Sequence, residues 1–102
     1  TLDSNRTQQV MEMALMRLSQ DKASVLIVDI TGVPVIDTMV ANHLIQMVAA
    51  VRLMGAESIL TGISPDTART IVHLGIDLSD LNARTSLAQG LRLALEMVSE
   101  GR

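Results

Sequence analysis

The chain has 102 residues, of which 48% are hydrophobic and none is aromatic, and its formal net charge is −3. This length predicts one domain, and the hydrophobic fraction supports a packed core and argues against disorder. Without aromatic residues or a block of Lys and Arg, the chain is not expected to bind nucleic acid or an anionic membrane. The absence of cysteine excludes disulfides, thiolate metal sites and a Cys nucleophile.

The first predicted elements are a helix and a strand. Residues 4–19 repeat apolar side chains at helical spacing, which predicts an amphipathic helix with Asp3 or Ser4 as its N-cap. The run from Ser24 to Ile30 is continuous and rich in β-branched residues, as is typical of a strand buried on both faces. Pro34 cannot donate to a strand ladder, so the residues around it are expected to form a loop or a sheet margin.

A second helix and a second strand follow. Asp37 is a favoured N-cap residue and precedes a predicted helix that runs to about Met54. Gly55 then fits the position after a helix end, where glycine is preferred. Residues 58–61 predict a short strand.

The last third of the chain predicts two more helices. Pro65 suits the first turn of a short helix that stops at Gly75. Residues 76–84 are expected to be irregular, with a short strand near Leu81, and Ser86 caps a final helix through about Ser99.

The alternation of helices and strands predicts an α/β fold whose sheet has largely parallel neighbours. Two or three strands make a thin sheet for this much helix. Further strands are therefore expected ahead of Thr1, and residues 1–102 are interpreted as one domain from a longer protein.

Few of these residues could form a catalytic site. The sequence has no Gly-rich phosphate loop and no metal motif around His43 or His73. A triad could be drawn from Asp37, Thr38 and His43, but His43 lies more than one helical turn beyond Thr38 and is rotated away from it. We therefore expect no enzyme, no cofactor and no metal. The alternative, a small-ligand or enzymatic domain using these three residues, predicts a concave polar pocket at this turn.

The helix that follows Asp37 is unusually apolar. Residues 38–51 contain no charged side chain, and their apolar residues spread around most of the helix. Such a helix is buried on more than one side, which favours a partner surface. Two alternatives stay open, namely cover by segments that precede this chain and a purely structural oligomerisation domain.

The hydroxyl of Thr38 is suited to act as a phosphorylation switch. A phosphoryl group adds about −1.5 to −2 charge and three acceptor oxygens, which a helix N-terminus accommodates. A partner docked on the adjacent apolar helix would have to desolvate that charge or pair it with a cation. Phosphorylation would thus change binding while the fold stays intact.

Residues Val25 to Ile76 resemble a STAS domain, the fold of anti-sigma-factor antagonists. The resemblance rests on the buried strand and on four short segments, Val35-Ile36-Asp37-Thr38, Arg52-Leu53-Met54-Gly55-Ala56, Gly62-Ile63-Ser64-Pro65 and Leu74-Gly75-Ile76. It implies a STAS-type mixed sheet with helices packed against it, from which the family's N-terminal strands are missing in this chain.

Within that family, the segment Asp29 to Ala41 is most similar to the stressosome co-antagonists, the RsbR-like proteins. This resemblance implies that a serine/threonine switch kinase phosphorylates Thr38. It also implies assembly with a paralogous single-domain antagonist into a large cytoplasmic scaffold, which promotes the activity of an alternative sigma factor by capturing or releasing the kinase. The resemblance further implies a sensory N-terminal domain that is not part of residues 1–102.

The same resemblance implies a second phosphorylated threonine and a partner-binding surface. Thr70 is our choice for the second phosphoacceptor, with Thr67 and Thr61 as rivals. The residues expected to meet the partner surround the first site, namely Asp37, Thr38, Met39, Asn42 and His43.

Overall fold

A computed structural model describes residues 4–33, 36–75 and 81–101. Helices and strands alternate in the predicted order of helix, strand, helix, strand, helix, short strand and helix. They are α1 (Ser4–Asp21), β1 (Val25–Asp29), α2 (Thr38–Leu53), β2 (Glu57–Thr61), α3 (Pro65–His73), β3 (Ala83–Arg84) and α4 (Leu87–Ser99). None of the described helices has both the length and the hydropathy needed to cross a membrane.

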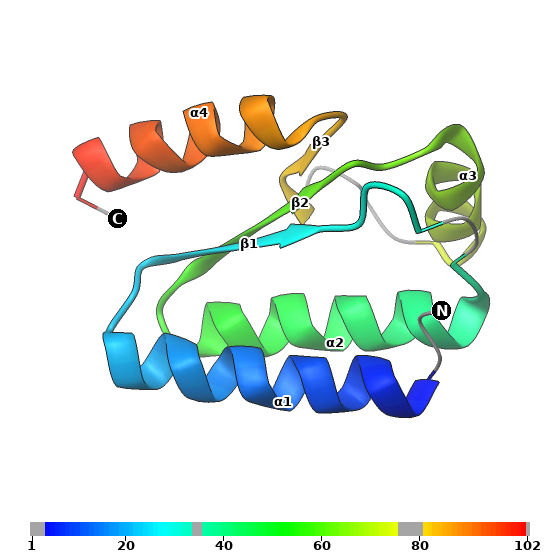
Figure 1. The fold of residues 1–102 in the computed structure, drawn as a ribbon, viewed down its shortest axis with the longest axis horizontal. Helices are drawn as coiled ribbons and strands as arrows, with labels where there is room; N and C mark the ends of the chain where they lie inside the picture. Colours follow the sequence, from blue (N-terminus) through cyan, green and yellow to red (C-terminus); the bar gives the residue numbers. More distant parts are fainter. Residues whose placement is uncertain (1–3, 34–35, 76–80, 102) are drawn as a thin grey trace.

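The three strands form one sheet in the order β1-β2-β3. Both described pairs are parallel, with Val25 opposite Glu57 in the first and Leu60 opposite Ala83 in the second. Helices α1 and α2 lie side by side on one face of the sheet, and α4 crosses the other face (Figure 1). Helix α3 lies near the start of α2 (Figure 1). The predicted α/β class, with helices packed against the sheet, is confirmed.

Strand β1 differs from its predicted environment. Its residues Val25–Val28 are only half-buried, whereas Ser58–Thr61 of β2 are fully buried. The prediction of burial on both faces is therefore wrong for β1. The physical reason is position, because β1 has one strand neighbour among the described residues and β2 has two.

Most other predicted boundaries hold within two residues. Helix α1 includes Ser4 and continues to Asp21, and the short strand follows Leu81 at Ala83–Arg84. The alternative cap Asp3, the loop residues 34–35 and residues 76–80 lie outside the described residues.

The apolar side chains of α2 are covered mainly by this domain itself. The inner face of α2 is buried against the sheet and α1 through Val40, Ala41, Leu44, Met47 and Val51. Among its large apolar residues, Met39 and Leu53 are exposed, at 59% and 90%. Because α1 packs along its flank, the apolar composition of α2 does not by itself require a partner. The apolar surface that α2 offers to another protein is limited to a few positions such as Met39.

Helix α4 approaches the sheet closely at Gly90. A Cβ at position 90 would overlap the Cγ2 methyl of Thr61, whose side chain is fully buried in β2. Glycine at this position lets the backbone of α4 rest directly on the central strand.

We predict that Gly90→Ala destabilises the domain although alanine favours helix. Overlap with a buried, β-branched neighbour costs about 1–3 kcal/mol, and helix propensity offsets about 1 kcal/mol. Thr61→Ser deletes the obstructing methyl and keeps the hydroxyl. In that background Gly90→Ala should become stabilising, as measured by urea unfolding. An equal effect of Gly90→Ala in both backgrounds would contradict the close approach.

Candidate functional site

The start of α2 is fixed by Asp37. The residue has extended backbone angles, and its Oδ1 accepts a hydrogen bond from the backbone N–H of Val40 at 2.8 Å. Asp37 is therefore the N-cap, and Thr38 is the first helical residue. Because Asp37 supplies the capping oxygen, the Thr38 hydroxyl is not needed for this role.

The five residues predicted to meet a partner lie together on the first turn and a half of α2. Asp37, Thr38, Met39 and Asn42 are exposed, and His43 is half-buried. A hydroxyl, a carboxylate and the exposed side chain of Met39 thus share one solvent-facing surface. Methionine at such a position can adapt its shape to a partner.

The alternative of a catalytic site at Asp37, Thr38 and His43 predicts a concave polar pocket at this turn. Four hollows of about 260 to 370 Å³ are lined entirely by described residues, and none includes Asp37, Thr38 or His43. The described residues also contain no group of three or more His, Asp and Glu side chains that could hold a metal ion.

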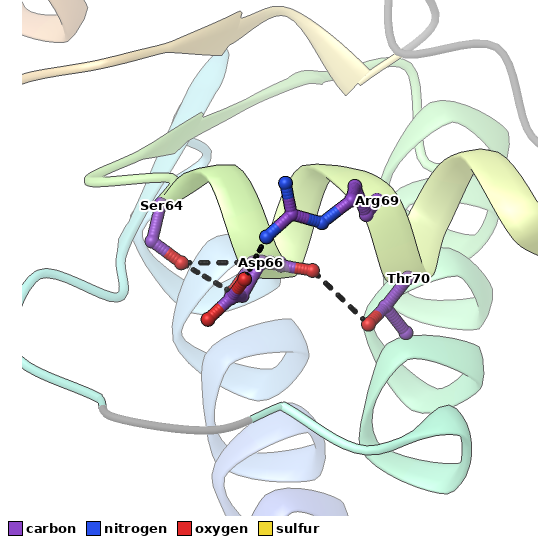
Figure 2. Close-up of polar contacts among 5 residues, drawn as sticks. Ser64, Asp66, Arg69 and Thr70 are labelled. Carbon is purple, nitrogen blue, oxygen red and sulfur yellow. Dashed lines mark hydrogen bonds and ion pairs between the residues drawn. The ribbon is translucent and has the colours of Figure 1, made fainter.

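The second predicted phosphoacceptor, Thr70, lies on α3 and is half-buried. Its Oγ1 donates a hydrogen bond to the carbonyl oxygen of Asp66 at 3.2 Å (Figure 2). The Asp66 carboxylate forms an exposed ion pair with Arg69, one residue before Thr70. Ser64 caps the helix by accepting a hydrogen bond from the N–H of Thr67 at 3.2 Å.

The rival threonines are buried. Thr67 is 3% exposed and Thr61 is 0% exposed. The Thr67 hydroxyl accepts a hydrogen bond from the Ser64 hydroxyl at 3.1 Å, and the Thr61 hydroxyl donates to Oδ1 of Asp29 at 2.8 Å. A kinase could reach either hydroxyl only after the surrounding structure had opened.

Asp29, at the end of β1, takes part in a network that sequence reasoning missed. Its Oδ1 accepts hydrogen bonds from the N–H and hydroxyl of Thr31, at 3.3 and 2.7 Å, in addition to the one from Thr61. These bonds, led by that of the Thr31 hydroxyl and then that of Thr61, hold the pKa of Asp29 below its usual value. Asp followed by Thr-Gly after a strand is a turn signal. This signal could have indicated the short-range hydrogen bonds between Thr31 and Asp29.

The turn stabilised by Asp29 also packs tightly against β2. Gly62 has a φ of +78°, and a Cβ on it would overlap Thr31. The ends of β1 and β2 are thereby joined at the edge of the sheet from which the chain continues towards Asp37 and Ser64.

Comparisons with known proteins agree on one family. The model of the family described as "STAS domain" matches residues 1–90. The chain is 50% identical over 97 residues to RsbT co-antagonist protein RsbRA of Bacillus subtilis (strain 168), covering 95% of this chain and 35% of that protein. It is 40% identical over 90 residues to RsbT co-antagonist protein RsbRD of the same organism, covering 88% and 32%. The chain therefore spans about a third of the length of these relatives.

Solved structures give the same relationship. A variant of RsbS from Moorella thermoacetica matches with a TM-score of 0.86 and 29% identity, over 97% of this chain and 84% of that chain. A chain from the stressosome, described as a signal integration and transduction hub, matches with a TM-score of 0.79 and 28% identity, over 90% and 80%.

Removing the cap should destabilise the domain. We expect Asp37→Ala to cost about 0.5–2 kcal/mol, because the N–H of Val40 loses its acceptor. Glu12→Ala, which removes an exposed carboxylate from α1, is the matched control and should have little effect. Unfolding in urea measures both. Equal stability of Asp37→Ala and the wild type would show that the capping bond is unimportant.

Asp29 should make the folded state sensitive to acid. Its pKa is lower in the folded state than the ordinary value of 3.8, so its contribution to stability is complete above the unfolded-state pKa. That contribution is lost as pH falls through the folded-state pKa. Asp29→Asn keeps the accepting oxygen but does not titrate. We expect the melting temperature of this variant to fall less steeply below about pH 4 than that of the wild type. Parallel curves would contradict the assigned hydrogen bonds.

Proposed function

The chain belongs to the STAS domain family and is related to the RsbR and RsbS proteins of the stressosome, and from this premise we propose that it is a phospho-regulated interaction and scaffold domain. The observation that carries the proposal is the exposed Thr38 at the capped start of α2. This arrangement presents a hydroxyl to a kinase while the fold is held by other groups.

We propose that Thr38 is the main phosphoacceptor. The helix N-terminus offers backbone N–H groups and the positive end of the helix dipole to a phosphate. The Asp37 carboxylate beside it is a like charge, so the net effect of the phosphate on stability is small. A partner that contacts Met39 and Asn42 would meet almost two additional negative charges at the centre of its interface. Phosphorylation therefore changes binding more than folding.

The proposed partner is a serine/threonine switch kinase that the domain captures or releases, and this exchange promotes the activity of an alternative sigma factor. Support comes from the similarity to RsbRA and RsbRD, which are described as RsbT co-antagonists. The residues proposed to meet the partner are Asp37, Thr38, Met39, Asn42 and His43, which share one surface. In this role the domain is a kinase substrate and a binding module, not an enzyme.

We further propose that the domain forms either a homo-oligomer or, with a paralogous single-domain antagonist, a large cytoplasmic assembly. The similarity to RsbS and to a stressosome chain supports this assembly. The relatives are about three times as long as this chain, which leaves room for a sensory domain outside residues 1–102.

Thr70 is proposed as the second phosphoacceptor. Its side chain is half-buried at the flank of α3, whereas Thr61 and Thr67 are buried. Exposure therefore favours Thr70 over its two rivals.

The kinase reaction tests this function directly. Incubation of the domain with its cognate switch kinase and ATP, followed by peptide mass spectrometry, should place a phosphate on Thr38. Thr38→Ala should abolish that modification while changing stability by no more than about 0.5 kcal/mol, as expected of a surface substitution. Thr38→Asp should reproduce the effect of phosphorylation on binding only in part, because a carboxylate adds one negative charge whereas a phosphate adds almost two.

Thr85→Ala is the matched control, because Thr85 is also exposed but lies just ahead of α4. It should be modified like the wild type. A wild-type domain that the kinase leaves unmodified, or a Thr38→Ala variant modified to the same extent, would refute the proposal.

A further inference from the structure

The Thr70 hydroxyl takes part in the structure of α3, in contrast to that of Thr38. It donates to the carbonyl oxygen of Asp66, four residues earlier, and this bond directs the side chain against its own helix (Figure 2). On the neighbouring face of α3, Thr67 and Ile71 are buried at 3% and 1% exposure. Thr70 therefore lies at the border between the core and the solvent.

Phosphorylation would remove this donor. The ester oxygen and the three terminal oxygens of a dianionic phosphate can only accept hydrogen bonds, and the carbonyl of Asp66 is also an acceptor. The two groups cannot keep the contact that the hydroxyl makes. The Thr70 side chain must then leave the carbonyl, and threonine has a second rotamer available in helices.

The charges around Thr70 oppose a phosphate in the present arrangement. The Asp66 carboxylate lies four residues earlier on the same flank of α3, where like charges repel each other. Arg69 is ion-paired with that carboxylate (Figure 2), and both side chains are largely exposed, at 68% and 79%. A phosphate on Thr70 would compete with Asp66 for the Arg69 guanidinium.

Position within the helix adds to this difference. Thr70 is the sixth of nine residues in α3, away from the free N–H groups that favour a phosphate at a helix start. Thr38 is the first residue of α2, beside the N–H groups of a helix start, and Asp37 caps that helix. An acidic residue lies near both threonines, but only Thr38 lies beside the free N–H groups of a helix start, so the same modification meets different local environments at the two sites.

We propose that the two phosphoacceptors act by different physical means. A phosphate on Thr38 changes the charge of the surface and leaves the fold as it is. A phosphate on Thr70 breaks the bond to the Asp66 carbonyl, draws Arg69 away from the Asp66 carboxylate and loosens α3. Because α3 contacts α2, whose first turn carries Thr38, this change alters the surface beside the first site. The inference rests on the proposed function for its signalling role.

The test uses protein that carries phosphothreonine at position 70 or at position 38, incorporated during synthesis, so that no kinase is needed. We expect phosphothreonine at 70 to lower the melting temperature by about 4–8 °C and to speed amide exchange in α3. Phosphothreonine at 38 should do neither. Equal melting temperatures and unchanged exchange in α3 at both positions would overturn the inference. Failure of the kinase to modify either threonine would instead count against the proposed function.

Three substitutions separate the contributions within α3. Thr70→Val removes the donor without adding charge and should reproduce only part of the loss. Arg69→Gln should lower the melting temperature further in the protein with phosphothreonine at 70. Arg17→Gln breaks a comparable exposed ion pair, that with Asp21 on α1, and should not respond to the phosphate. If the phosphate at position 70 changes the effects of Arg17→Gln and Arg69→Gln on the melting temperature alike, the proposed transfer of Arg69 from Asp66 to the phosphate is wrong.

Discussion

The buried side chain of Thr61 is the contact on which the rest of this structure depends. Its hydroxyl donates to Asp29 at the end of β1, and its methyl lies where only glycine at position 90 lets α4 approach. The backbone carbonyl of Thr61 also accepts a hydrogen bond from the N–H of Ile30 at 2.9 Å. One residue of the central strand thus joins β1, β2 and the helix on the far face of the sheet. From this edge of the sheet the chain continues towards α2 and α3, which carry the two proposed phosphoacceptors.

The roles of capping and switching are divided between neighbouring residues at the start of α2. Asp37 satisfies the N–H of Val40, so Thr38 can be modified without loss of the cap. On α3 the division is different, because Ser64 caps the helix but Thr70 is itself bonded to the backbone. Together these arrangements explain how one small domain could contain one site that changes only its surface and another that changes its structure.

Local signals in the sequence predicted much of the fold, and long-range contacts account for most of the errors. Asp37 as cap and Gly55 after the end of α2 were predictable because both act on adjacent backbone. The half-buried state of β1 was not, because it depends on the number of strands beside it. The cover that α1 gives α2, and the bond from Thr61 to Asp29, join segments far apart in the chain, which no periodicity reveals. Thr38 was proposed as a phosphoacceptor from its place at a helix start and from family resemblance, and Thr70 from family resemblance alone. Their different bonding could be found only in the structure.

The central claim is that a phosphate on Thr38, the first proposed site, changes the surface of this domain without a change of fold. Backbone amide spectra of the domain, recorded before and after a phosphate is placed on Thr38, test it most directly. We expect shifts confined to Asp37 and the first turn of α2, with the amides of Thr61, Ile30 and Gly90 unchanged. Shifts spread through β2 and α4 would contradict the claim, because the phosphate would then act through the core and not through the surface.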